Sequence, residues 1–288
     1  MMGGKLPNLE LTWQQPLVIA VVLFGTSALS LAVKRRWLTK ARPYLTEIGL
    51  ILTLFAMWQL AGGLSMMGLD RALIRGQDIW NFERAIHLPS EATEQSWIIG
   101  HPVLVELTNL YYATLHFPTL IATLIWLYVR HRDRYPFWRN TVVLVTGMCL
   151  LIQFIPVAPP RLLPNIDIVD TGLLYGQSVY GPNGVEMANQ LAAMPSVHVG
   201  WAVLAALAVW TSTTSRWRWL LVAHAIITSW VVAVTANHYW LDGIVAIGLL
   251  GLSIGILLGL KRLTRAYGRD SQGAQQGASL PDFAGQSR

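Results

Sequence analysis

Two short histidine motifs carry the residues of this chain that could do chemistry. The first, Pro195–His198, reads Pro-Ser-Val-His, and the second, Asn237–Asp242, reads Asn-His-Tyr-Trp-Leu-Asp. Each motif opens a long apolar run, a setting in which ionisable side chains are costly and are by default functional. With Arg161 upstream, two histidines, a hydroxyl and a carboxylate could perform phosphoryl transfer at a membrane surface.

Each of these residue types meets one requirement of phosphoryl transfer. Arg161 offers a bidentate guanidinium, and Ser196 would stand at a helix start, where exposed amides and the helix dipole favour anions. His238 and Asp242 are four residues apart in the sequence and share one face of a helix, so the carboxylate can hold the imidazole tautomer. His198 can then protonate the leaving oxygen.

The elements that must position these motifs are membrane spans. Of the 288 residues, 53% are hydrophobic and 12% are charged, whereas soluble domains carry about 25% charged residues. Apolar blocks of about 18 residues or more indicate spans. There are seven such blocks: Pro16–Val33, Tyr44–Met67, Val103–Val129, Asn140–Val157, Val197–Thr213, Trp217–Ala236 and Leu241–Leu260.

The sequence therefore predicts an all-α polytopic helical bundle with about six to seven transmembrane helices. Residues 1–15 are expected to form an N-terminal segment, and residues 16–262 the integral membrane domain. Residues 263–288 are rich in Gly, Gln and Ser and are expected to form a disordered cytoplasmic tail.

Basic residues lie mainly on one side of this predicted topology, in alternate loops and after the last span. They are Lys34, Arg35, Arg36, Lys40, Arg42, Arg130, Arg132, Arg134, Arg139, Arg216, Arg218, Lys261, Arg262, Arg265 and Arg269. The positive-inside rule places these loops in the cytoplasm, and Arg161 and both histidine motifs on the extracytoplasmic side. We therefore expect an integral plasma membrane protein. The net charge of +6 comes mainly from these loops and reflects the membrane topology, so it does not indicate a nucleic-acid partner.

Polar residues elsewhere leave several alternatives open. Asn109, Tyr112 and His116 share a face of the third span and either line a substrate pocket or bond between helices. Residues 71–88 are predicted to form an amphipathic helix that either lies in the membrane interface or caps the bundle. Cys149 and His224 are expected to be packing residues, and one cysteine can form neither an intramolecular disulfide nor a cysteine metal cluster.

The two motifs together resemble the phosphatidic acid phosphatase type 2 superfamily, over roughly 103–260. The flanks AMPSVHVGWA and ANHYWLDG, and the upstream PVAPPRLLP, are similar to its inositol phosphorylceramide synthase (aureobasidin-resistance) branch, with related bacterial proteins. The resemblance implies that His238 is the nucleophile that forms a phosphohistidine, that Asp242 assists it and that His198 is the general acid. It further implies that Ser196 and Arg161 bind phosphate, with no cofactor and no metal.

Departures from the phosphatase pattern bear on the reaction. That branch has a lysine seven residues before its first arginine and an arginine six residues before its last histidine, where this chain has Phe154 and Val232. It also has glycine in place of Val197. The synthase-like branch relaxes these positions, so the departures favour it.

The function expected on these grounds is a membrane lipid phosphotransferase. It would move a phospho-headgroup, such as phosphoinositol, from a phospholipid to a lipid alcohol. The first alternative is a phosphatase acting on phosphatidate-like or polyprenyl phosphates. The second is a non-catalytic lipid-binding membrane protein. In each case the partner is a membrane lipid.

Overall fold

The computed structural model describes residues 12–33, 35–65, 69–178 and 190–278, and this part of the chain is helical with no extended strand. The helices are α1 (Gln14–Ala32), α2 (Arg36–Ser65), α3 (Leu69–Ala85), α4 (Glu91–Ile99), α5 (Pro102–Thr114), α6 (His116–Arg130), α7 (Tyr135–Gln153), α8 (Thr171–Leu174), α10 (Val197–Ser212), α11 (Arg218–Val234) and α12 (Trp240–Ala278), with a 3₁₀ turn, η2 (Pro160–Leu162). The predicted all-α polytopic fold is confirmed.

The predicted apolar blocks are helical, but they are not equally long. α1, α2, α7 and the first part of α12 are each long and apolar enough to cross a membrane. α5 and α6 meet at a 45° bend and make a fifth candidate if they form one span. α10 and α11 have 16 and 17 residues, a little below the usual length of a span. By length and composition the described residues thus give four or five spans, against the six to seven predicted.

The C-terminal end of the predicted membrane domain differs from expectation. α12 continues without a break to Ala278, whereas the composition predicts disorder from residue 263. Extending an existing helix avoids the cost of nucleation, so a segment of weak helix formers can remain helical beyond a span. Residues 1–11 of the predicted N-terminal segment and residues 279–288 of the tail lie outside the described residues.

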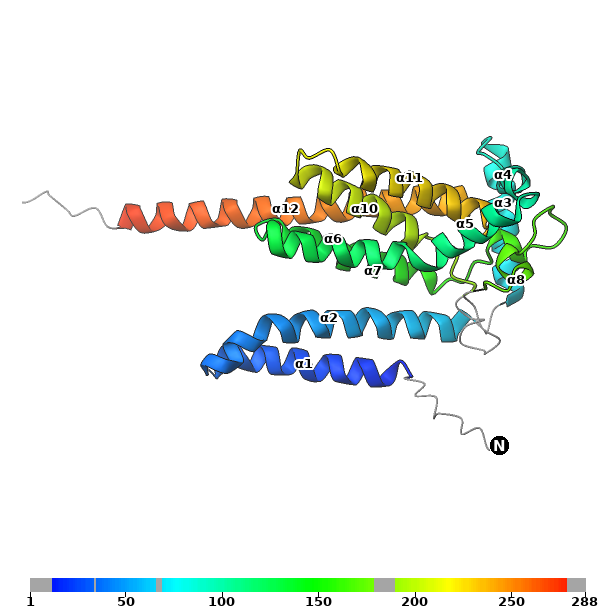
Figure 1. The fold of residues 1–288 in the computed structure, drawn as a ribbon. Helices are drawn as coiled ribbons and strands as arrows, with labels where there is room; N and C mark the ends of the chain where they lie inside the picture. Colours follow the sequence, from blue (N-terminus) through cyan, green and yellow to red (C-terminus); the bar gives the residue numbers. More distant parts are fainter. Residues whose placement is uncertain (1–11, 34, 66–68, 179–189, 279–288) are drawn as a thin grey trace, which may run out of the picture.

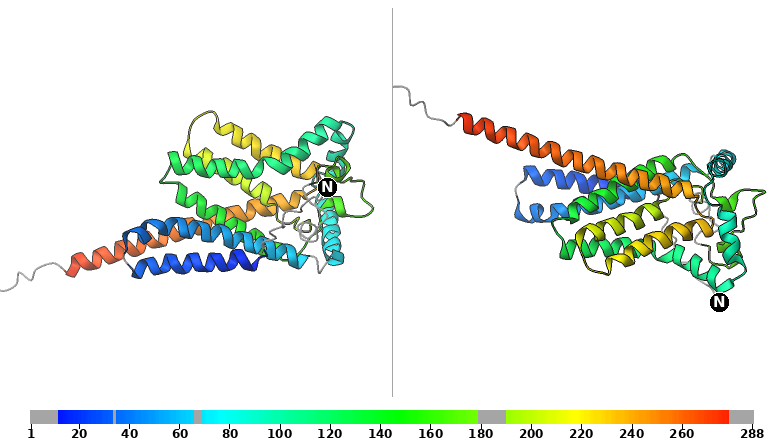
Figure 2. Two further views of the ribbon diagram at one scale, coloured as in Figure 1. Left: turned by 60° about the horizontal axis from the view of Figure 1, so that its bottom comes forward. Right: turned by 90° about the horizontal axis from the view of Figure 1, so that it is seen from above.

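α6, α7, α10 and α12 form the centre of the bundle. Leu127, Val145, Leu204 and Leu250 come one from each of these helices and are all buried in a single cluster that also contains Cys149. The expectation that Cys149 is a packing residue is therefore confirmed. α1 and α2 form a hairpin that packs along α7 (Figures 1 and 2). Large apolar side chains remain exposed on the outer helices, as a lipid-facing surface requires.

The two ends of the bundle differ in character. One end is capped by α3, α4 and α8 (Figure 1). The turns between α1 and α2, α6 and α7, and α10 and α11 lie at the other end, where α12 also extends beyond the bundle (Figures 1 and 2). These turns and the end of α12 carry most of the basic residues, whereas the capped end carries Arg71, Arg75, Arg84 and Arg161. The predicted segregation of charge is thus present in the fold. The predicted helix over 71–88 is confirmed as α3.

Candidate active site

His238 and Asp242 meet at the start of α12, as predicted. α11 ends in a tight turn in which the backbone amides of Asn237 and His238 both donate to the Val232 carbonyl, at 3.1 Å. Ala236 takes a left-handed φ of 53° in this turn, a conformation that costs a non-glycine residue about 1 kcal/mol or more. The turn places His238 just before the first residues of α12. The side chains of His238 and Asp242 are both buried.

The hydrogen bonds of His238 define its tautomer. His238 Nδ1 lies 2.6 Å from the Ala193 carbonyl oxygen and 3.2 Å from Asp242 Oδ2. A carbonyl oxygen can only accept, so Nδ1 carries the hydrogen and, in the neutral ring, Nε2 carries the lone pair. Asp242 Oδ2 also accepts from the Tyr239 amide at 2.9 Å, which fixes the carboxylate. The arrangement leaves Nε2 as the ring nitrogen whose lone pair is available for attack.

His198 faces that lone pair. Its Nδ1 lies 3.2 Å from His238 Nε2, so His198 Nδ1–H donates to the basic nitrogen of its partner. A phosphorus atom bonded to Nε2 would use the same lone pair. An N–P bond at Nε2 would therefore break this hydrogen bond and would leave the His198 proton available to another oxygen.

Small residues bring the starts of α10 and α12 together. A Cβ on Gly243 of α12 would meet Val199 of α10 at 3.4 Å, and one on Gly200 of α10 would meet Ala246 of α12 at 3.6 Å. The Ser196 amide donates to the Asp242 carbonyl at 3.2 Å. Such close backbone approach is what small residues permit between membrane helices, and here it places the two motifs side by side.

Ser196 caps α10 as expected for a residue at a helix start. Its buried hydroxyl accepts from the Val199 amide at 3.4 Å. The hydroxyl thus helps to hold the first turn of the helix. The predicted contact of Ser196 with phosphate stays a prediction.

Arg161 joins the site through the residue before the nucleophile. It lies in η2, its Nε donates to Asn237 Oδ1 at 2.9 Å, and its backbone amide donates to the Ala236 carbonyl at 3.1 Å. Its Nη1 donates to Asp170 Oδ2 at 2.8 Å and to Gln190 Oε1 at 3.2 Å. The guanidinium is thus buried in a polar network that sits directly against the His238 turn.

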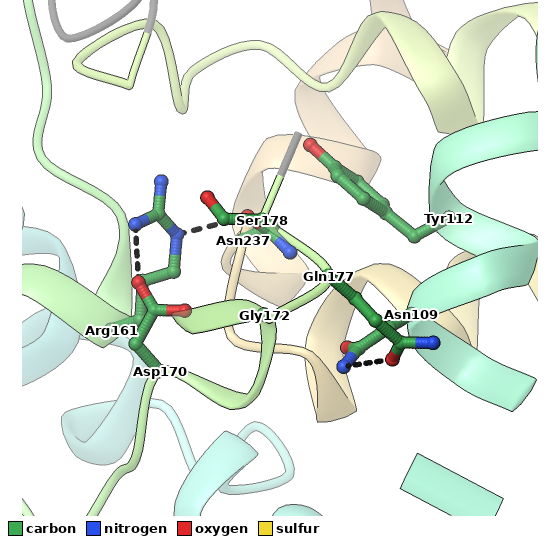
Figure 3. A pocket seen from close by; sticks show the side chains of 8 residues that line it. All are labelled: Asn109, Tyr112, Arg161, Asp170, Gly172, Gln177, Ser178 and Asn237. Atoms are coloured by element: carbon green, nitrogen blue, oxygen red, sulfur yellow. Dashed lines mark hydrogen bonds and ion pairs between the residues drawn. The ribbon is translucent and has the colours of Figure 1, made fainter. Parts of the chain in front are cut away.

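A small polar pocket lies beside this network. Figure 3 shows its lining, which includes Asn109, Tyr112, Arg161, Gln177 and Asn237. Asn109 Nδ2 donates to Gln177 Oε1 and to the Thr171 carbonyl, each at 3.1 Å. Asn109 and Tyr112 therefore contribute to one pocket with the phosphate-binding candidate, although Asn109 also serves as a link between α5 and α8.

His116 takes a different place from that expected of a pocket residue. The chain bends between α5 and α6, so His116 starts a new helix rather than continuing the face of Asn109. Its ring lies edge-on to the His198 ring, with centroids 4.1 Å apart, and tilted to Tyr112, with centroids 6.4 Å apart. The predicted set of three is divided: two residues line the pocket and His116 packs on His198.

Several contributors to the site could not be identified from their own sequence context. Asp170, which caps α8 and binds Arg161, has the sequence context of a solvated loop residue. The Ala193 carbonyl reaches His238 because Val157 and the segment 191–193 exchange backbone hydrogen bonds. Both depend on the loop between α7 and α10 folding back on the bundle. His224, expected to be a packing residue, bonds through Nδ1 to Tyr111 Oη at 2.6 Å.

Acidic residues of α3 and α4 hold the first turn of α12. Glu83 Oε1 accepts from the Leu241 amide at 2.6 Å, and Glu91 Oε1 accepts from the Trp240 amide at 3.1 Å. Glu94 Oε2 accepts from the Trp240 indole at 3.2 Å. Burial away from water, and then the adjacent Glu91 carboxylate, raise the pKa of Glu83 to about 9. Glu83 is therefore protonated at neutral pH.

The comparisons with known proteins agree with this geometry. The PAP2 superfamily matches residues 77–256, more than half of the chain. This range includes Arg161, both histidine motifs and every helix from α4 to α11. Neither the comparison with curated proteins nor that with solved structures found a match. The chain belongs to the PAP2 superfamily and is a membrane enzyme of the phosphatase and phosphotransferase class that acts on lipid phosphates.

Proposed function

We propose that this protein is a lipid phosphotransferase of the inositol phosphorylceramide synthase type. It moves a phospho-headgroup, such as phosphoinositol, from a phospholipid to a lipid alcohol through a phosphohistidine at His238. The observation that carries the proposal is the orientation of the His238 ring, whose Nδ1 is held by the Ala193 carbonyl and Asp242 while Nε2 faces His198. A two-step transfer needs a nucleophile and, next to it in space, an acid that protonates the leaving group.

In the first step, His238 Nε2 attacks phosphorus and the bond from phosphorus to the diacylglycerol oxygen breaks. His198 gives its proton to that leaving oxygen. The imidazole becomes a cation on forming the N–P bond, and the Asp242 carboxylate, 3.2 Å from Nδ1, stabilises it. This carboxylate therefore acts on the charge, whereas the Ala193 carbonyl is sufficient to hold the tautomer.

In the second step, the hydroxyl oxygen of the acceptor attacks phosphorus and the N–P bond breaks. The hydroxyl proton goes to His198, which restores the acid for the next turnover. His238 leaves as a neutral imidazole with its hydrogen still on Nδ1. With a lipid alcohol as acceptor the product is a new phospho-headgroup lipid, and with water it is a free phosphate ester.

Arg161 and Ser196 are the proposed phosphate ligands. Phe154 and Val232 stand where the phosphatase branch has cations, so Arg161 must provide more of the positive charge. Arg161 Nη1 already bonds to Asp170 and Gln190. A phosphate would exchange with one of these acceptors, and a guanidinium forms stronger, charge-assisted bonds to phosphate than to a neutral amide.

The proposed site faces the extracytoplasmic side of the plasma membrane. It lies at the end of the bundle capped by α3, α4 and α8, opposite the turns that carry the basic residues (Figure 1). The positive-inside rule supports this orientation. A site at the mouth of the spans also suits a donor whose headgroup lies at the interface and whose acyl chains lie in the bilayer.

The test uses purified protein in mixed micelles with phosphatidylinositol and a lipid alcohol, and in separate reactions phosphatidate or a polyprenyl phosphate. Products are followed by mass spectrometry, with His238→Ala as the inactive control. We expect a new phosphoinositol lipid from the wild type alone. Free phosphate from phosphatidate or polyprenyl phosphate alone would instead make the protein a phosphatase. Equal behaviour of wild type and His238→Ala on every lipid would favour a non-catalytic lipid binder.

A further inference from the structure

A cluster of carboxylates lies beneath the nucleophile, outside the groups that the proposed reaction uses. Glu83 of α3 and Glu91 of α4 are both fully buried. Each accepts a hydrogen bond from a backbone amide in the segment between His238 and Asp242, as given above. No other described residue accepts from these two amides through its side chain. The pair therefore replaces the solvent that would otherwise satisfy the first amides of α12.

The cluster has fewer cations than carboxyl groups. Arg84 Nη1 donates to Glu91 Oε2 at 3.2 Å, and Arg84 Nη2 lies 3.6 Å from Glu83 Oε2. Arg84 is also held by the Pro89 carbonyl at 2.6 Å and by the Trp80 ring at 4.6 Å. One guanidinium therefore faces two buried carboxyl groups, with Glu94 close to the same cation.

A proton on Glu83 removes this excess of negative charge. Glu83 Oε2 is buried and has no hydrogen-bond donor among the described residues. A protonated carboxyl group donates a hydrogen bond from its O–H, so that oxygen needs no donor from another residue. Glu83 makes a side-chain hydrogen bond of this kind to Glu91. Burial and the charge of Glu91 act in the same direction on the pKa of Glu83. The neutral acid then bridges Leu241 and Glu91.

We propose that Glu83, in its protonated form, is a positioning residue: with Glu91 it fixes the first turn of α12 and thereby sets the His238–Asp242 pair for attack on phosphorus. The expected effect on kcat rests on the proposed function. The expected effect on the position of His238 does not. A displacement of about 1 Å at a reacting group can lower the rate by about 100-fold, and Glu83 and Glu91 hold the backbone amides of Leu241 and Trp240, between His238 and Asp242.

The charges that face Glu83 predict an alkaline limit. They are Glu91 on α4, Arg84 on its own helix, Asp242 on α12, and the phenol of Tyr239. Loss of the Glu83 proton breaks its hydrogen bond to Glu91 and places two charged carboxylates side by side. The folded-state pKa is raised above the ordinary value of 4.5 to about 9, so the stabilisation is complete at low pH and is lost as pH rises through 9.

The experiment compares Glu83→Gln and Glu83→Ala in the full-length protein. Glutamine keeps an acceptor for Leu241 and a donor for Glu91 but cannot ionise. We expect the wild type to lose kcat as the pH rises through about 9. We expect Glu83→Gln to keep wild-type kcat at neutral pH and to lack this loss. We expect Glu83→Ala to lower kcat by about 100-fold with little change in KM. Asp78→Ala, a change on the same helix away from this cluster, is the matched control.

A second readout does not depend on turnover. The ¹⁵N-histidine NMR spectrum of the protein in detergent micelles reports the Nδ1 and Nε2 environment of His238, identified by its loss in His238→Gln. We expect Glu83→Ala to shift this signal and Asp78→Ala to leave it unchanged. An unshifted signal in Glu83→Ala, or an alkaline limit retained in Glu83→Gln, would overturn the positioning role. Absence of turnover in the wild type on every lipid would overturn the proposed function instead, and the spectrum would still decide the role of Glu83.

Discussion

His238 has two acceptors on the same nitrogen, and they do different work. The Ala193 carbonyl, at 2.6 Å, holds the hydrogen on Nδ1 whatever the charge of the ring. In the proposed reaction, the Asp242 carboxylate adds a negative charge that stabilises the ring when it becomes a cation. In a serine-protease triad the carboxylate performs both tasks. Here they are divided, and the division has a measurable consequence.

Asp242→Asn should lower kcat by about 100-fold and leave KM nearly unchanged. The tautomer survives through Ala193, so the loss reflects the charge alone, which acts in the transition state rather than in substrate binding. Steady-state kinetics on the lipid substrate measure both constants. Asp133→Asn, on the exposed turn after α6, is the control. A near wild-type kcat for Asp242→Asn would show that the carboxylate does not stabilise the intermediate.

His198→Ala should be selective for the leaving group. Without its proton donor, the variant should lose about 10²- to 10⁴-fold on a phospholipid, whose leaving alkoxide is strongly basic. On an aryl phosphate ester, whose leaving phenolate needs no proton, the loss should be small. His238→Ala should lose activity on both substrates. Comparison of the two substrates for each variant separates acid from nucleophile, and an equal loss for His198→Ala on both would contradict the acid role.

At the scale of elements, α3 and η2 must approach closely for the acidic cluster and Arg161 to reach the site. Gly76 makes this possible: a Cβ there would lie 2.7 Å from the Ala158 carbonyl oxygen and 2.8 Å from Tyr239 Oη. Neither group can move freely, because the Ala158 amide donates to the Ala72 carbonyl and Tyr239 Oη donates to the Ala158 carbonyl at 2.8 Å.

Gly76→Ala should therefore destabilise the protein by about 1–3 kcal/mol, the usual cost of overpacking, and should lower activity. Gly147→Ala is the matched control, since Gly147 lies in α7 and a methyl group there would meet nothing within 4 Å. It should be neutral or stabilising by up to about 1 kcal/mol. Thermal unfolding in detergent and kcat measure both effects. Equal stability of the two variants would mean that α3 does not need this close contact.

The sequence was a good guide to helices and motifs and a poor guide to what lies between them. Long apolar runs and the spacing of His238 and Asp242 are local signals, so the seven apolar blocks and the pair itself could be predicted. Asp170 could not be assigned to Arg161, because their contact depends on the fold of the loop that separates them. Glu83 and Glu91 reach α12 across about 150 residues of chain, and no period or motif encodes such a distance.

The bend between α5 and α6 shows a second limit. Spacing alone places Asn109, Tyr112 and His116 on one face, which assumes a continuous helix. The 45° bend redirects His116 toward His198 while the other two residues line the pocket. Pro118, in the first turn of α6, lacks a backbone hydrogen-bond donor and is compatible with a new helix start there. The sequence thus contained a reason for the bend.

At the scale of the whole molecule, the charge asymmetry predicts an orientation that can be measured. In a Cys149→Ala background, Asp167→Cys on the loop at the site end and Asp133→Cys on the opposite turn each provide one exposed thiol. A membrane-impermeant maleimide should label the first in intact cells and the second only after permeabilisation. The reverse pattern would place the site in the cytoplasm and contradict the positive-inside assignment.

The central claim is that the phospho-headgroup passes through His238, and trapping the intermediate tests it most directly. Purified protein is mixed with phosphatidylinositol labelled with ³²P, quenched in alkali within a fraction of one turnover, and digested for mass spectrometry. We predict label on the peptide that contains His238, stable in alkali and lost in acid as an N–P bond requires, and absent from His238→Ala. A labelled lipid product formed at the wild-type rate with no label on the protein would contradict the account.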